Sequence, residues 1–272
     1  MSLKELENLD GLSQDRTDII IPANVTFNAL FDEVKASLFI FSNKGLREGI
    51  IMDSVNESAN ATAFSKSNIP TQSVYRLGLA YHTQNEVADQ RGTLVSMLYD
   101  EFCKEGIFTK DKAVARLLQY GSYLYYLGEY IESGAGSQHT FYIISNSELN
   151  AITHKERIVI ALLASYKNRS LFNQYLEPFN QWFTVSFIDQ LKAFGGMIKF
   201  ANALNDSHMN VVKDILLHKK DDGYELLIYH KGSVIAESYR ALRQKKHISR
   251  ILKKSFVLTF IDLDTGEKTI VE

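Results

Sequence analysis

The most strongly basic segment of the chain lies near its C-terminus. Residues 240–254 contain seven lysines and arginines, one histidine and no acidic residue. At 3.6 residues per turn, Arg243, Lys246 and Arg250 fall near one face of a helix. Such a face suits a long polyanion, because each phosphate that it neutralises releases counterions. The candidate binding residues are Arg240, Arg243, Lys245, Lys246, Arg250, Lys253 and Lys254.

The other side of this segment is apolar. Ala241, Ile248 and Ile251-Leu252 lie mostly on that side, so the pattern predicts an amphipathic helix. A second interpretation of the cationic side is a solvated face, or an interface, balanced by nearby aspartates. Aromatic residues do not alternate with the cations, which argues against a site for single-stranded nucleic acid.

Other residue types give weaker evidence of a binding or catalytic site. Glycine-rich candidates for a phosphate loop occur only at 134–136 and 195–196, and we interpret both as turns or points of close helix packing. We expect His139 to bond a neighbouring helix and His247 to lie at the surface. The sequence therefore predicts no catalytic residue and no metal ligand in this chain.

The whole-chain composition is that of an ordinary globular protein. Across 272 residues, 32 acidic side chains face 30 lysines and arginines, for a net charge of −2, which argues against a nucleic-acid or membrane-surface partner. No apolar run approaches the roughly 20 residues of a membrane-spanning helix. The single cysteine, Cys103, excludes an intrachain disulfide. We expect a cytoplasmic protein without nucleic-acid or membrane partners.

The N-terminal region has the pattern of an incomplete α/β domain. Residues 1–53 contain one continuous apolar run, 38–41, between Ser37 and Ser42, which predicts a strand buried on both faces. A lone strand leaves its backbone groups unpaired, so we expect a larger sheet that is completed outside this sequence or by a second copy. Residues 54–72 are rich in serine, asparagine and alanine and predict a linker.

Helical patterns dominate the middle of the chain. Apolar spacing predicts a helical domain over 73–209. Strands are then predicted at 210–218, 224–229, 256–262 and 268–271, with a helix at 233–254. Residues 210–272 therefore form a small α/β subdomain, and the predicted fold class is mainly α.

Two separate stretches carry a family resemblance. Gly45-Leu46-Arg47-Glu48-Gly49, together with 11–22, resembles the end of the second actin-like (ribonuclease H-like) domain of the Ppx/GppA phosphatases. Segments 120–149, 161–169 and 198–208 resemble, in the right order, the HD-like helical domain of that family, which includes exopolyphosphatase and guanosine pentaphosphate phosphohydrolase. The resemblance implies that residues 1–53 end an actin-like domain and that 73–209 form an HD-like domain.

HD domains hold a divalent metal with a histidine, an adjacent His-Asp pair and a later aspartate. By register, these four positions fall on Val87, Tyr125, Tyr126 and Asn202. Such side chains are poor ligands for divalent metals. We therefore expect a degenerate site without a metal, in which tyrosine rings fill the former pocket.

The resemblance also implies a function. The family enzymes remove terminal phosphates from polyphosphate or pppGpp with Mg²⁺, in a cleft formed by loops that precede the segment matched here. This chain is expected to be the C-terminal part of such an enzyme, to form a homodimer, to grip polyphosphate, to hold no cofactor itself and to be inactive alone. The alternative is a standalone, non-enzymatic scaffold or regulatory module that binds a polyanion or a guanine nucleotide.

Overall fold

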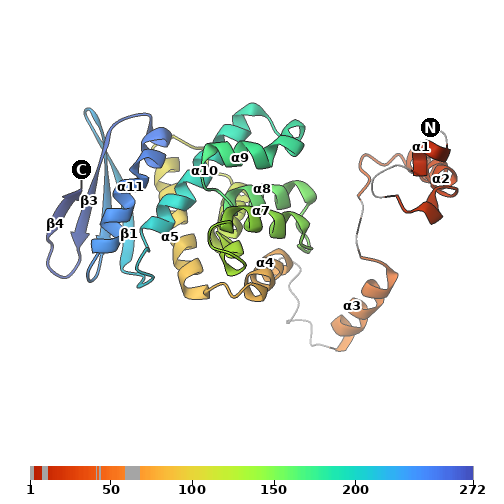
Figure 1. The fold of residues 1–272 in the computed structure, drawn as a ribbon, viewed down its shortest axis with the longest axis horizontal. Coiled ribbons are helices and arrows are strands. Elements are labelled where there is room, and N and C mark those ends of the chain that lie inside the picture. The colour runs from red at the N-terminus through yellow and green to blue at the C-terminus, as the bar shows by residue number, and fades with distance from the viewer. Residues whose placement is uncertain (1–2, 8–11, 41, 43, 59–67, 272) are drawn as a thin grey trace. The chain divides into compact units, whose positions relative to one another are not determined.

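The computed structural model describes residues 3–7, 12–40, 42, 44–58 and 68–271. The chain divides into two compact units, residues 1–64 and 65–272, and each is described here by itself. Figure 1 shows the elements in chain order. The domain boundaries expected from composition stay predictions.

The first unit is helical throughout its regular parts. Its elements are α1 (Leu3–Glu7), η1 (Gln14–Arg16), α2 (Ile20–Glu33) and α3 (Leu46–Ser58). No residue of α2 is buried, and the helix exposes apolar side chains such as Val25, Phe27 and Leu30. This helix therefore leaves an apolar surface uncovered within its own unit.

The strand expected at 38–41 is wrong for the described residues. Residues 38–40 have no regular secondary structure and are exposed, and Phe41 lies outside the described residues. The physical reason is the lack of a paired neighbour, because a strand without one has no partners for its backbone N–H and C=O groups. The expected linker is also partly helical, since residues 54–58 belong to α3 and 69–72 to α4, while 59–67 lie outside the described residues.

Helices form most of the second unit, as the sequence predicts. They are α4 (Ile69–Ala80), α5 (Asn85–Lys104), α6 (Lys112–Tyr123), η3 (Leu127–Tyr130), α7 (Gly136–Asn146), α8 (His154–Ala164), α9 (Arg169–Leu176), η4 (Glu177–Trp182) and α10 (Val185–Ala203). Side-chain caps begin several of them. The Asp111 carboxylate accepts from the backbone N–H groups at the start of α6, and Thr153 with Glu156 forms a capping box at α8.

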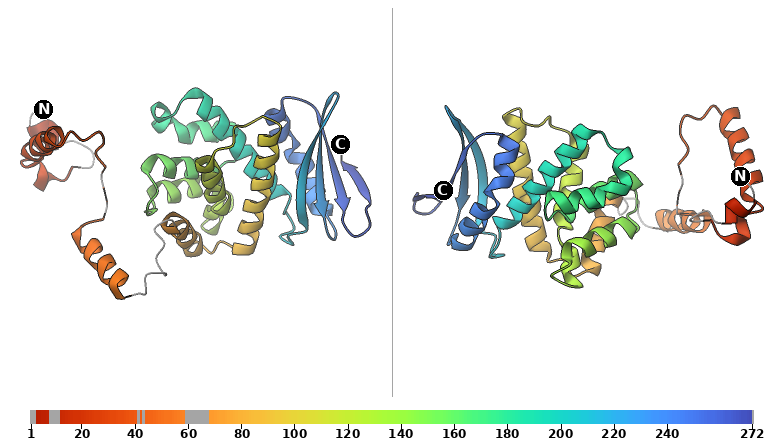
Figure 2. Two further views of the ribbon diagram at one scale, coloured as in Figure 1. Left: turned by 180° about the vertical axis from the view of Figure 1, so that it is seen from behind. Right: turned by 45° about the horizontal axis from the view of Figure 1, so that its top comes forward.

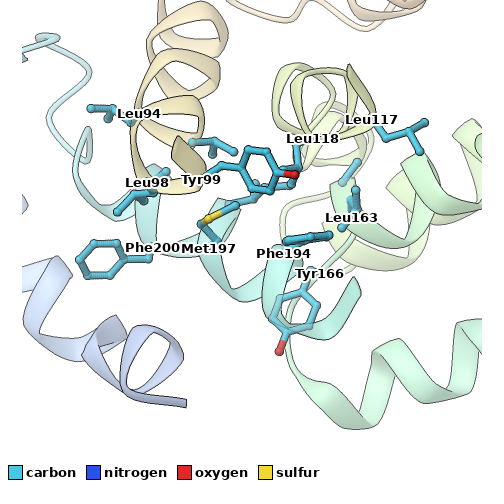
Figure 3. Close-up of a cluster of buried hydrophobic side chains, with 14 of the residues drawn as sticks. Leu94, Leu98, Tyr99, Leu117, Leu118, Leu163, Tyr166, Phe194, Met197 and Phe200 are labelled. Carbon is cyan, nitrogen blue, oxygen red and sulfur yellow. The ribbon is translucent and has the colours of Figure 1, made fainter. Parts of the chain in front are cut away.

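The core lies where α5, α6, α8 and α10 pack together. Leu94 and Leu98 of α5 meet Leu118 of α6 and Phe200 of α10, and all four are fully buried or nearly so (Figure 3). Helix α8 is buried from Ile158 to its end, which places it at the centre of this unit. Burial of these side chains is the main source of stability for the helical part.

A four-stranded sheet ends the chain. Its strands are β1 (Val212–Lys220), β2 (Gly223–His230), β3 (Phe256–Asp262) and β4 (Lys268–Val271), in the order β1-β2-β3-β4. Strands β1 and β2 form an antiparallel hairpin, whereas β2 and β3 run parallel and are joined by α11 (Ile235–Leu252). A parallel pair needs such a crossover, which explains the place of α11 in the sequence. Figure 2 shows α11 and the other helices of the second unit on one side of the sheet.

The predicted fold class is confirmed at this level: the protein is mainly helical, with a small four-stranded sheet. The four strands and the helix predicted for residues 210–272 are all present, with shifts of a few residues at their ends. The first unit, in contrast, contains helices where an α/β pattern was expected.

Candidate anion-binding site

The basic helix predicted from the sequence is α11. Its apolar side, which includes Ala241, Ile248 and Ile251, is buried, while Arg243, Lys246, Arg250 and Lys253 are exposed. The amphipathic pattern is therefore confirmed. A buried acid secures the start of the helix, where the Glu237 Oε1 atom accepts a hydrogen bond of 2.9 Å from the Ser207 backbone N–H.

Helix α11 packs closely against α10 because α10 carries two adjacent glycines. A Cβ atom on Gly196 would lie 3.2 Å from the Cβ atom of His247, and one on Gly195 would lie 2.4 Å from the ring of Tyr166. Gly195 has no room for a side chain, and a Cβ atom on Gly196 would fit only if His247 shifted slightly. This explains the Gly195-Gly196 pair as a point of close packing, as the sequence predicts.

Beside this contact lies a cavity of about 840 Å³. Side chains from α10 and α11 line it, together with residues from the ends of α5 and α8 and the start of α9. Two of the predicted cations, Arg250 and Lys253, reach it, and Arg169 and Lys192 join them. The carboxylate among the described lining residues is Asp189, whose Oδ1 atom is 3.6 Å from the Lys192 Nζ atom. Four cations thus surround the cavity against one acid.

His247 lies at the wall of this cavity, and its expected surface position is wrong. The side chain is only 5% exposed, because it packs against Gly196, and its Nε2 atom has no hydrogen-bond partner among the described residues. Burial lowers the pKa of His247 to about 4, with a further contribution from the surrounding cations Lys199, Lys246, Arg250 and Arg169. The imidazole is therefore neutral at neutral pH.

Positive charge also accumulates beneath the cavity wall. Burial lowers the pKa of Lys199, and the positive charges of Lys246 and Lys167 lower it further. Its ammonium group donates to the Lys167 carbonyl oxygen at 2.7 Å. The neighbouring Lys246 and Lys167 repel the Lys199 ammonium group, so a bound anion would reduce that repulsion.

The remaining predicted cations have other contacts. Arg240 pairs with Asp206 at 3.0 Å, Arg243 lies over the ring of Tyr239, and Lys245 lies over the ring of Phe256. Lys254 is exposed beyond the end of α11. The structure thus brings two predicted cations into the cavity, places Lys246 near His247, and leaves the other four outside.

The positions expected for a degenerate metal site also come together. Val87, Tyr125 and Tyr126 line a second cavity of about 250 Å³. The fourth position, Asn202, is reached through Arg91, whose Nε atom donates to the Asn202 Oδ1 atom at 2.8 Å. The Nη1 atom of Arg91 donates to the Ser122 carbonyl oxygen at 2.8 Å, and its guanidinium lies over the Tyr125 ring.

Arg91 is the residue of this cavity that the sequence argument passed over. Its side chain is 8% exposed, and burial lowers its pKa to about 10, so it stays charged at neutral pH. A divalent metal does not fit beside a buried guanidinium, and the described residues contain no group of three histidine, cysteine or acidic side chains arranged to hold one.

In the described ranges, no helix is long and apolar enough to cross a membrane.

Comparison with known proteins identifies the family of the chain. Residues 69–194 match the family model described as "Ppx/GppA phosphatase, domain III". Residues 1–58 match the model described as "Ppx/GppA phosphatase family". The chain belongs to the Ppx/GppA phosphatase family.

Two curated relatives are each named guanosine-5'-triphosphate,3'-diphosphate pyrophosphatase. The one from Vibrio atlanticus (strain LGP32) is 24% identical over 156 residues, which is 57% of this chain and 30% of the relative. The one from Pseudoalteromonas translucida (strain TAC 125) is 25% identical over 170 residues, which is 62% of this chain and 33% of the relative. The chain therefore spans about a third of the length of these relatives.

Proposed function

We propose that this chain provides the part of a Ppx/GppA-type phosphatase that grips the phosphate chain of the substrate. The observation that carries the proposal is the cavity between α10 and α11, where Arg169, Lys192, Arg250 and Lys253 face a single carboxylate. Lysine and arginine bind phosphate oxygens through charge-assisted hydrogen bonds. The substrate would be polyphosphate or pppGpp, and the names of the two relatives support pppGpp.

Within this proposal, the helical part of the second unit is an HD-like domain whose metal site has been lost. Its support is the meeting of Val87, Tyr125 and Tyr126 at one cavity, with Asn202 bound to Arg91. The buried guanidinium of Arg91 lines the same cavity, and its positive charge disfavours a metal cation there. Mg²⁺ is expected for the family reaction, and we assign no residue of this chain to it.

The first unit is proposed to be the end of an actin-like domain and to contribute to a homodimer or to pack on the remainder of such a domain. Its support is the uncovered apolar surface of α2, where Val25, Phe27 and Leu30 are exposed. Apolar patches of this kind mark interaction sites. Light scattering after size-exclusion chromatography would test the dimer, and a monomer at micromolar concentration would contradict it.

The test of the gripping role is polyphosphate binding across a salt series, with phosphate release measured in parallel. Five cations surround the cavity when Lys246 is included, which predicts a slope of log K against log salt of about −3.5, at about −0.7 for each phosphate contacted. The double variant Lys246→Glu with Arg250→Glu should weaken binding at least tenfold at low salt. The matched control is Lys213→Glu with Lys219→Glu, which makes the same change in charge on β1 away from the cavity.

The outcome tests both the site and the activity of the chain. Unchanged affinity in the cavity variant, or equal loss in the control, would contradict a phosphate-chain site between α10 and α11. Binding with phosphate release would identify an active enzyme. Binding without release would fit either the gripping part of an enzyme or the non-enzymatic module that the sequence left as the alternative.

A further inference from the structure

The cavity around Arg91 has a composition that the phosphate-chain site does not explain. It measures about 250 Å³ and is lined by the loop before α5, the start of α5, the end of α6, and η3. Its walls carry aromatic rings, and Arg91 and Glu129 are charged groups of opposite sign among its lining residues. Its volume is below the roughly 300–1,000 Å³ of sites for drug-sized ligands, so it suits a smaller group such as a single ring system.

Arg91 has hydrogen-bonding capacity to spare. A guanidinium has five N–H donors, and the described contacts use one on Nε and one on Nη1, toward Asn202 and Ser122. No bond of Nη2 and no ion pair of Arg91 is found among the described residues. A buried cation with unused donors favours a ligand that brings an acceptor atom.

Glu129 provides acceptors of the opposite kind in the same cavity. Burial raises the pKa of its carboxyl, and the charges of Arg91 and His208 act in the other direction. Glu129 would repel a simple anion in this cavity, and Arg91 would repel a simple cation. A neutral group with an acceptor on one edge and a donor on another would bond to both side chains.

The rings of the cavity offer surfaces for a flat ligand. His82 and Tyr130 are stacked, with centroids 5.0 Å apart and planes 23° from parallel, and Tyr125 and Tyr126 lie with centroids 4.7 Å apart. Nucleic-acid bases stack favourably on aromatic side chains, because every base has a π-face. Flat aromatic ligands are therefore favoured over aliphatic ones.

The backbone around this cavity is unusual as well. Three lining residues without the freedom of glycine, His82, Tyr126 and His208, have φ angles of 55°, 59° and 59°. A positive φ is uncommon for tyrosine and less so for histidine, and residues in such conformations cluster at binding sites. Three of them around one cavity indicate that its shape is maintained at some cost in backbone energy.

We propose that the cavity around Arg91 binds a purine base, with Arg91 donating to the acceptor edge of the ring and Glu129 accepting from its amino or imino edge. The tyrosine and histidine rings would cover its faces. A purine combines a donor edge, an acceptor edge and a large stacking surface in one neutral ring system. This site is separate from the cavity between α10 and α11.

Nucleosides test this proposal because they carry a base and no phosphate. Binding of adenosine and guanosine to the full chain would be measured by saturation-transfer NMR and competition, with uridine as the ring that is smaller and lacks an amino group. We expect at least one purine nucleoside to bind tenfold or more tightly than uridine. Glu129→Gln, a nearly isosteric change, should weaken that binding about tenfold. Tyr130→Ala, which removes an exposed ring, should weaken it at least fivefold.

Three results would overturn the proposal. These are equal binding of uridine, unchanged binding in both variants, and competition by pyrophosphate as effective as by the nucleoside, which would indicate a simple anion site. Arg250→Glu serves as the control and should leave nucleoside binding unchanged, since Arg250 lines the other cavity. Because polyphosphate has no base and nucleosides have no phosphate, either site can fail while the other stands.

Discussion

The buried histidine between α10 and α11 makes the stability of the protein depend on pH in a calculable way. His247 has its pKa lowered to about 4 in the folded protein, whereas an unfolded histidine titrates near 6.5. Between these two pKa values His247 is protonated in the unfolded chain and neutral in the folded protein. The contribution of the buried, neutral His247 to the free energy of unfolding is therefore fully present above about pH 6.5, and it is lost as the pH falls toward about 4.

The magnitude follows from the size of the shift. A difference of about 2.5 pKa units corresponds to about 3 kcal/mol of unfolding free energy, at about 1.4 kcal/mol per unit. His247→Gln keeps a neutral, polar side chain of similar size and removes the titration. We therefore expect the difference in stability between the protein and this variant to shift by up to about 3 kcal/mol between pH 7 and pH 4.

The assay is urea unfolding followed by circular dichroism at half-unit steps from pH 7 to pH 4. Carboxylates titrate in the same range, but they are common to both proteins and cancel in the difference. Parallel loss of stability in the protein and in His247→Gln would refute a buried neutral imidazole. Saturating polyphosphate adds a second check, because a polyanion near Arg250 and Lys246 should raise the pKa of His247 and reduce its pH effect.

Three substitutions test how the helices are packed. Gly195→Ala should lower stability by about 1–3 kcal/mol in thermal unfolding, because the new Cβ atom would meet the buried ring of Tyr166 at 2.4 Å; an unchanged melting temperature would contradict the close packing. Asp111→Ala should cost about 1 kcal/mol, since the carboxylate accepts from the N–H groups of Ala113 and Val114 at the start of α6, and Asp111→Asn should retain most of that stability. Arg91→Leu should cost about 2 kcal/mol in urea unfolding, because it leaves the Asn202 amide oxygen without its donor and removes one of the donors to the Ser122 carbonyl oxygen; equal stability would show that Arg91 does not join these helices.

Much of the fold of the second unit could be predicted from local sequence patterns. The apolar runs at 210–218 and 224–229 predicted two strands that are separated by a few residues, and these strands form the β1–β2 hairpin. The apolar spacing of Ala241, Ile248 and Ile251 likewise predicted the buried side of α11. In both cases the information lies within one element or one turn.

Contacts between distant segments could not be predicted in this way. The strand at 38–41 has the composition of a buried strand, yet composition cannot supply the neighbouring strands that a ladder requires. His247 sits in a strongly basic segment and was expected at the surface. Its burial depends on Gly196 of α10, which is far away in the sequence and has no local signature of this contact.

The candidate site also combines a local sequence pattern with contacts between distant segments, and both would affect how it binds a phosphate chain. The seven cations of residues 240–254 form a charged helix face wherever α11 lies, but a face alone is not a cavity. The cavity exists because Gly195 and Gly196 let α10 approach Tyr166 and His247, which brings Arg169 and Lys192 opposite Arg250. The same approach buries His247 as a neutral group, so the wall between the helices adds no further positive charge at neutral pH. A phosphate chain in this cavity would meet cations from three helices at once, so its binding should depend on the α10–α11 packing as much as on the charge of α11.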